Sequence, residues 1–219
     1  MLRLLFEKKG NAIWISHLDL MRLFQRAFKR AGLPLTHTQG FNPRPSVSIA
    51  LPLSVGVESR CELLDFELEG VDVSCEEILH KLNAALVDGV EVLSVYPAGK
   101  KIKELAYLRC QVTLEYDQGV ADTAVSQIQE LLSREVVLVE KKSKNGIQDQ
   151  DIIPMIRSFA VSSTDPNCIV IEAVICCQNP SLNPAQLAAA VCRHLPELTP
   201  DFGRCCRLEI YDHNFDVFR

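Results

Sequence analysis

The stretch SHLDLMRLFQRAFKRAGLP, residues 16–34, decides the fold of the first half of the chain. Ser16 and Asp19 have the spacing of a helix capping box, and Gly32 and Pro34 are typical of a helix end. At ~100° per residue, the apolar side chains fall on one arc of the helical wheel. The opposite arc carries Arg22, Arg26, Lys29 and Arg30. The stretch therefore predicts an amphipathic helix that buries one side on a sheet and exposes four cations.

The segments around this helix predict a complete small domain. Strands are expected over residues 2–9, 46–53, 61–70 and 90–97, residues 12–15 form a short extended piece, and a second helix begins at Ser74. The order of strand, helix, strand, strand, helix, strand is the ferredoxin-like, or split βαβ, pattern. Residues 98–104 form a polar, basic connector to the second half.

The second half repeats this order with more irregular spacing. Strands are expected over residues 108–116, 136–142, 167–177 and 205–212, with a further short strand near residues 159–162, and helices over 121–135 and 183–195. Extra residues around 143–160 indicate an inserted hairpin that turns at Asn145–Gly146, because Asn-Gly is a strong turn signal. The sequence thus predicts an α+β protein with tandem ferredoxin-like domains, residues 1–98 and 105–219. In each, helices cover one face of an antiparallel sheet.

Cysteine use and hydropathy indicate the compartment. Nine cysteines lie in a chain of which 47% is hydrophobic, and several fall inside apolar runs, which predicts buried, reduced thiols in a cytoplasmic protein. No signal peptide and no membrane-spanning segment is recognised. Without a Cys-x-x-Cys pair, we expect this chain to hold no metal and no iron–sulfur cluster by itself. An alternative is that the pairs Cys176-Cys177 and Cys205-Cys206 converge on a metal.

The charge is unevenly distributed along the chain. The net charge is −5, which argues mildly against nucleic acid as a partner. Residues 1–45, however, contain eight Lys/Arg and two acids, or +6, and the remaining 174 residues contain 15 bases and 26 acids, or −11. A molecule polarised in this way can bind an anion on one face while the other face keeps it in solution.

The loop QGFNPRP, residues 39–45, follows the basic helix. Its two prolines fix two φ angles and restrict the residues before them, so a ligand would order this loop at low entropic cost. Phe41 can stack on a base and Arg44 can bind a phosphate or a base edge. The predicted RNA- or anion-binding residues are Arg22, Arg26, Lys29, Arg30, Phe41, Asn42 and Arg44. The residues expected to shape this site are Ser16, His17, Asp19, Gly40 and Pro43.

Two alternatives remain open. His17, in the first turn of the helix, can act as a neutral general base in a metal-independent RNA endonuclease or RNA-modifying enzyme. The basic helix can instead dock an acidic protein, which would make the chain a protein-interaction module only. The acidic turn DQDIIPMIR, residues 149–157, is expected to be structural; the alternative is that Asp151 and Arg157 form an ion pair or contact a ligand. No phosphate-binding glycine loop, Ser-His-Asp order or His-Glu-x-x-His motif occurs, which disfavours an ATPase, a hydrolase or a zinc protease.

Residues 3–97 resemble a bacterial family of radical-SAM-linked proteins that hold a domain of unknown function. Its Ser-His-Leu-Asp motif matches residues 16–19, and its Gly-Phe-Asn-Pro motif matches residues 40–43. The likeness is weaker over residues 105–219, where Asp151-x-x-Pro154 still fits. The family usually has His where this chain has Arg44, and often Tyr-Ser where it has His37-Thr38. These departures argue against a catalytic role for position 44 and leave a binding role open.

The resemblance implies a partner and no established activity. Members are encoded beside, or fused to, a radical SAM protein that often has a cobalamin-binding-type domain. The partner would use S-adenosylmethionine, an iron–sulfur cluster and cobalamin, and this chain would bind none of them. The gene neighbours expected for the family favour RNA as the substrate, and tandem ferredoxin-like domains are similar to CRISPR-repeat RNA-processing endonucleases. The leading expectation is therefore a non-catalytic RNA-binding or substrate-presenting partner of a radical SAM enzyme.

Overall fold

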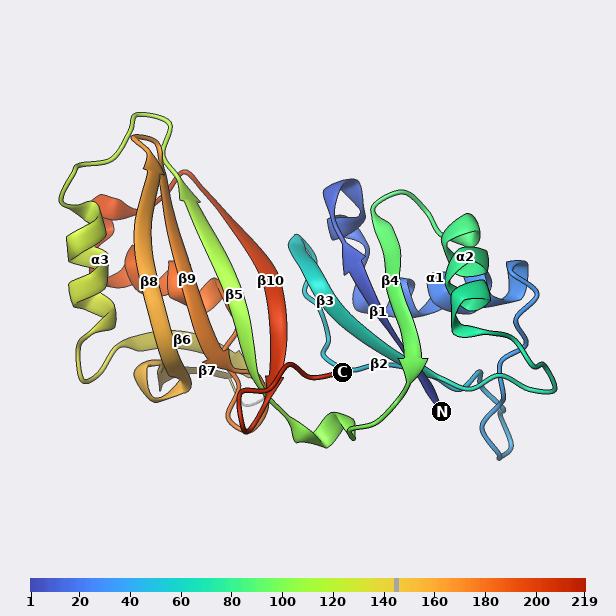
Figure 1. Cartoon of the computed structure of the whole chain (residues 1–219). Coiled ribbons are helices and arrows are strands. Elements are labelled where there is room, and N and C mark those ends of the chain that lie inside the picture. Colours follow the sequence, from blue (N-terminus) through green and yellow to red (C-terminus); the bar gives the residue numbers. More distant parts are fainter. Residues whose placement is uncertain (144–145) are drawn as a thin grey trace. The chain divides into compact units, whose positions relative to one another are not determined.

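A computed structural model describes residues 1–143 and 146–219. The chain divides into two compact units (Figure 1). Unit 1 comprises Met1–Glu104 with Phe218–Arg219, and unit 2 comprises Leu105–Val217. None of the described helices has the length and apolar composition needed to cross a membrane.

Unit 1 has the ferredoxin-like order of elements. These are β1 (Leu2–Lys8), α1 (His17–Arg30), β2 (Val47–Ile49), β3 (Val57–Phe66), α2 (Cys75–Ala85) and β4 (Val90–Pro97). Short 3-10 helices lie at Gly10–Trp14 and Ile102–Glu104. The strands lie in the order β4-β1-β3-β2, and each neighbouring pair is antiparallel. This arrangement confirms the α+β class that the sequence predicts.

The core of unit 1 lies between the sheet and its two helices (Figure 1). Phe24 of α1 packs edge-on against Phe6 of β1, with 4.7 Å between ring centroids. Phe28, one turn further, contacts Phe66 of β3 at 4.8 Å. All four rings are buried, so the apolar arc of the helical wheel is the face that fixes α1 on the sheet.

Unit 2 repeats the same topology. Its elements are β5 (Leu105–Glu115), α3 (Ala124–Leu132), β6 (Leu138–Ser143), β7 (Gly146–Asp151), β8 (Ile156–Asp165), β9 (Cys168–Cys176), α4 (Ala185–His194) and β10 (Phe202–Asp212), with 3-10 helices at Ile153–Met155 and Pro196–Leu198. Leaving out β6 and β7, the antiparallel order β10-β5-β9-β8 corresponds to that of unit 1. The pair β6–β7 forms a hairpin of its own between α3 and β8.

The structure corrects three strand predictions. The strand expected over residues 136–142 is β6, which pairs with β7 in the inserted hairpin, and β8 is the second strand of the pattern in unit 2. Residues 12–15, expected to be extended, belong largely to the 3-10 helix Gly10–Trp14, which begins at a glycine with a φ of +55°. The strand expected over residues 46–53 is limited to Val47–Ile49. Pro52 has no N–H to donate to a neighbouring strand, yet Leu51 and Leu53 remain buried. Their apolar pattern therefore indicated burial and not strand pairing.

Two boundaries also differ from the sequence prediction. The inserted hairpin spans Leu138–Asp151 and not residues 143–160, because the Asp151 carboxylate closes its open end by accepting the N–H groups of Val137 (3.0 Å) and Ile153 (3.2 Å). The Asn145 half of the predicted turn lies outside the described residues. The last two residues belong to unit 1, where Phe218 is buried under the Arg3 guanidinium, 5.1 Å from the ring centroid.

Candidate functional site

The N-terminus of α1 is held by the predicted cap. The Ser16 hydroxyl oxygen accepts the Asp19 backbone N–H at 3.2 Å, and the hydroxyl donates to the Asp19 carboxylate at 2.7 Å. Arg22 donates to the other carboxylate oxygen at 2.9 Å. The Ser16 hydrogen bond and then Arg22 lower the pKa of Asp19. This small network fixes the first turn of the helix and anchors Arg22.

The four cations of α1 are all exposed, but they are not equivalent. Arg22 is paired with Asp19. Arg30 donates to the backbone carbonyl of Ala85, the last residue of α2, where a cation satisfies an orphan carbonyl at a helix C-terminus. Within the described part of the chain, no ion pair or side-chain hydrogen bond is found for Arg26 or Lys29. These two are the cations of α1 that remain available to an anionic ligand.

Other cations of the basic N-terminal segment serve the fold. Arg3 is 1% exposed and forms a bidentate pair with Asp65, at 2.6 and 3.0 Å, and donates to the Lys100 carbonyl at 3.0 Å. Lys8 is fully buried and donates to the Ile15 carbonyl at 2.9 Å. Lys9 pairs with Glu7. The +6 charge counted along residues 1–45 therefore overstates the positive charge that reaches the surface.

The loop after α1 is an open hairpin (Figure 1, light blue, beyond the C-terminal end of α1). His37 pairs with Pro45 across it, and the N–H groups of Thr38 and Arg44 bond to the Arg44 carbonyl (2.8 Å) and the Thr38 hydroxyl (3.0 Å). Gly40 has a φ of +145°, which a residue with a side chain rarely adopts. Phe41 at the tip is 100% exposed. A fully exposed phenyl ring on a pinned turn is available for stacking.

The rest of the predicted loop site is also at the surface. Asn42, Pro43 and Arg44 are exposed. The structure thus places the predicted binding residues in one unit, in two adjacent segments, α1 and the hairpin that follows it. Of the residues expected to shape the site, Ser16 and Asp19 lie at the start of α1, and Gly40 and Pro43 lie near the hairpin tip.

His17 is half-buried at the first position of α1. Its Nδ1 is buried and has no hydrogen-bond partner among the described residues. Ser16 and Asp19 bond to each other and not to the imidazole. A general base is normally oriented by a second group, and the described residues supply none here.

Exposed apolar side chains that the sequence reasoning missed lie near the start of α1. Trp14, just before the helix, is 64% exposed, Leu18 in its first turn is 67% exposed, and Val55 is also exposed. Leu18 precedes Arg22 by four residues and therefore lies on the cationic face. Trp14 is the single tryptophan of the chain, and its position beside a basic helix was the available signal.

Asp151 has the structural role that was expected of this turn, and no ion pair between Asp151 and Arg157 is found among the described residues. Asp151 closes the β6–β7 hairpin. Arg157 donates to the Cys176 sulfur at 3.3 Å and lies over the Tyr107 ring, 5.4 Å from its centroid.

None of the nine cysteines forms a disulfide bond in the part of the chain that the structure describes. Burial raises the pKa of Cys110 and of Cys177 to about 12, and that of Cys205 to about 11. These thiols are therefore protonated and poor nucleophiles or ligands at neutral pH. Among the described residues, no group of three His, Cys, Asp or Glu side chains is arranged to hold a metal ion. The metal alternative for the paired cysteines finds no site in this part of the chain.

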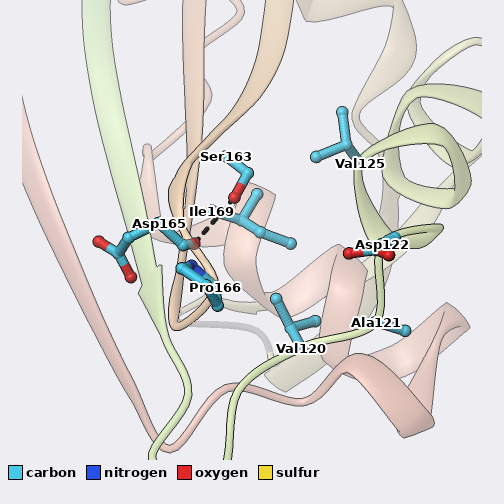
Figure 2. A pocket seen from close by; sticks show the side chains of 8 residues that line it. All are labelled: Val120, Ala121, Asp122, Val125, Ser163, Asp165, Pro166 and Ile169. Atoms are coloured by element: carbon cyan, nitrogen blue, oxygen red, sulfur yellow. Dashed lines mark hydrogen bonds between the residues drawn. The ribbon is translucent and has the colours of Figure 1, made fainter.

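Unit 2 has an open cavity of about 290 Å³ near the turn between β8 and β9 (Figure 2). Val120, Val125 and Ile169 give it apolar walls. The Ser163 hydroxyl is bonded to the Asp165 carbonyl at 2.8 Å, and the Asp165 carboxylate accepts the Asn167 N–H at 2.8 Å. These polar groups hold the turn, and none of the predicted site residues lies here.

Comparisons with known proteins place the chain in a family. No curated protein matches it. Among solved structures, it is similar to an unknown protein from Galdieria sulphuraria, with 10% identity over 96% of each chain and a TM-score of 0.27. The family model for an uncharacterised protein conserved in bacteria, DUF2344, matches residues 1–184. The chain therefore belongs to this family of uncharacterised bacterial proteins.

Proposed function

We propose that the chain is a non-catalytic RNA-binding protein that uses α1 and the hairpin after it. One observation carries this proposal: Arg26 and Lys29, which are exposed and have no partner among the described residues, are followed along the chain by a hairpin with a fully exposed phenyl ring. Cations bind phosphates in any sequence context. An exposed aromatic ring adds stacking on an unpaired base. Together they fit a nucleic acid better than either feature does alone.

The combination also favours RNA with unpaired bases. In RNA helices the base faces are stacked and the deep major groove excludes side chains, so proteins read loops and single-stranded segments by stacking. Phe41 is at the tip of its hairpin and can reach such a base. Arg44 on the same hairpin and Arg26 on α1 would contact the backbone on either side of it.

The partner is a proposal as well. We propose that the chain presents its RNA to a radical SAM enzyme, on the basis of the resemblance of residues 3–97. That enzyme would supply S-adenosylmethionine, an iron–sulfur cluster and cobalamin, and would carry out the chemistry. This chain would hold and orient the substrate. Such a division of labour is consistent with a basic surface that lacks an oriented catalytic base among the described residues.

A pair of matched double variants tests the RNA proposal. Arg26→Glu with Lys29→Glu removes the two available cations and spares Arg30, which caps α2. Arg134→Glu with Lys141→Glu makes the same change of net charge at exposed positions of unit 2. The probe is a fluorescein-labelled RNA hairpin with a loop of about eight uridines, measured by anisotropy at low salt. The first variant should lose on the order of 100-fold in affinity, and the second should bind nearly as the wild type does.

Equal losses in the two variants would mean that net charge alone governs binding and would overturn the site. Absence of binding by the wild type would overturn the RNA function itself. The exposed Trp14, Leu18 and Val55 favour a second candidate, docking of an acidic protein partner. Co-purification of the radical SAM enzyme that survives RNase treatment, without any RNA affinity, would support that candidate.

A further inference from the structure

Trp14 and Phe41 lie toward opposite ends of α1. Trp14 precedes the first helical residue by three positions, and the hairpin with Phe41 begins after the last one. The helix has 14 residues, so it is about 21 Å long at 1.5 Å per residue. Both rings are largely exposed, at 64% and 100%. Unit 1 therefore has an exposed aromatic ring toward each end of its basic helix.

The outer face of α1 joins these two positions. Leu18, Arg22, Arg26 and Lys29 follow one another at spacings of four, four and three residues, so they form one stripe along the helix. All four are exposed. The stripe begins beside Trp14 with an apolar residue and becomes cationic toward the hairpin. This order suits a single-stranded nucleic acid, with a base against the apolar end of the stripe and the phosphates along its cations.

The surroundings of Trp14 give it a fixed platform. A Cβ atom on Gly56 would lie 3.5 Å from the indole, so the ring rests against a residue without a side chain. The Gly56 N–H donates to the Ile13 carbonyl at 2.9 Å, which ties this turn to the segment that carries Trp14. A ring held on one side and open on the other is prepared for stacking, because little freedom is lost on binding.

We propose that the outer face of α1 is a track for a single-stranded RNA segment whose bases stack on Trp14 at one end and on Phe41 at the other. The inference rests on the RNA-binding function proposed above and adds Trp14, the second stacking site and the length of the ligand. At about 3.4 Å per nucleotide in a stacked strand, the ~21 Å helix alone corresponds to about six nucleotides, and the hairpin that carries Phe41 beyond the end of the helix makes this a minimum. A fully paired duplex offers no free base faces inside its length and would engage neither ring fully.

The single tryptophan makes the proposal directly measurable. Labelled uridine oligomers of about three to twelve nucleotides and a blunt RNA duplex are titrated into the full-length protein. Anisotropy of the label reports binding of any kind, and the intrinsic fluorescence of Trp14 reports stacking. We expect quenching by single strands, and an affinity that rises with length and levels off only beyond about six nucleotides. Trp14→Ala and Phe41→Ala should each weaken binding about 5- to 150-fold.

The variants include controls for folding and for position. Trp14→Phe should restore most of the affinity that Trp14→Ala loses, because a phenyl ring still stacks. Phe202→Ala removes an exposed ring from unit 2 and should leave affinity within about twofold. Circular dichroism of each variant checks that the fold is kept.

The outcomes distinguish a failure of the track from a failure of the RNA-binding function on which the track rests. Binding without quenching, unchanged in Trp14→Ala, would overturn the track and leave the RNA function standing on the hairpin alone. Binding that prefers the duplex would also overturn the track. If no RNA changes the anisotropy, the RNA function and the track both fail.

Discussion

The two units share one topology, and each has an insertion at the same point of it, but the two insertions differ in how they are held. In both, extra chain enters between the first helix and the second strand of the pattern. In unit 2 this insertion is the β6–β7 hairpin, and Arg193 of α4 ties it down through Asp149 at 2.5 and 3.1 Å. In unit 1 it is the hairpin that carries Phe41. The hydrogen bonds found in the described chain for residues 37–44 of this hairpin run within it.

The first helices of the two units, α1 and α3, also differ, in the charge of their outer faces. The outer face of α3 presents Ser126, Gln129 and Glu130, whereas that of α1 presents cations. Unit 2 thus has an insertion that is held by an ion pair, beside a helix with a neutral-to-acidic outer face. Unit 1 has a projecting insertion beside a basic helix. Fold alone does not distinguish the units. Their surfaces do, and the proposal of RNA binding therefore concerns unit 1.

The largest effect we expect is on stability, when a buried ion pair of unit 1 is broken and compared with an exposed ion pair of unit 2. Asp65→Ala in unit 1 leaves Arg3 buried without its carboxylate and should lower the free energy of unfolding by about 3 to 5 kcal/mol. The corresponding cross-strand pair of unit 2, Arg109 with Glu172 at 2.8 Å, is about half exposed. Glu172→Ala should therefore cost less than about 1 kcal/mol. Urea denaturation of both variants measures the difference, and equal costs would contradict the distinction.

A smaller effect separates the two kinds of cation on α1. Arg30→Ala removes the donor to the Ala85 carbonyl at the end of α2 and should destabilise the protein by about 1 kcal/mol. Lys29→Ala, one residue away and without such a contact among the described residues, should stay within about 0.5 kcal/mol. Thermal unfolding compares them. A loss in Lys29→Ala as large as that in Arg30→Ala would show that the exposed face of α1 is structural throughout.

Local patterns explain how much of the fold was predictable. Ser16, the apolar arc and Gly32 placed α1 within a residue of its observed ends, because capping and periodicity act within one helical turn. The order of elements followed and gave the ferredoxin-like pattern. The segment around Leu51 and Leu53 was not predictable in the same way, since an apolar alternation is the same for a paired strand and for a buried irregular segment.

The candidate site was predictable as a set of exposed residues but not as a set of contacts. The partner of Arg30 lies 55 residues away, and that of Arg3 lies 62 residues away. Composition cannot show that such partners remove a cation from the binding surface. Trp14 was missed because its segment was interpreted only as a short extended piece, which assigned the ring no surface role.

The smallest effect we expect comes from His17. With its Nδ1 unpartnered among the described residues, the imidazole lacks the second group that would orient it for proton transfer. His17→Ala should leave RNA affinity within about twofold, and neither the wild type nor the variant should cut RNA. Denaturing gel electrophoresis of labelled RNA after long incubation is the check. Cleavage by the wild type that His17→Ala abolishes would restore the enzyme alternative.

The salt dependence of RNA binding tests the central claim most directly. For single strands, the logarithm of the affinity falls with the logarithm of salt concentration by about 0.7 for each phosphate contact. Changing both Arg26 and Lys29 to Ala should therefore reduce the slope by about 1.4 relative to the wild type, while changing both Arg134 and Lys141 to Ala should leave it unchanged. A wild-type slope retained in the Arg26 and Lys29 variant would contradict the assignment of RNA binding to the basic face of α1.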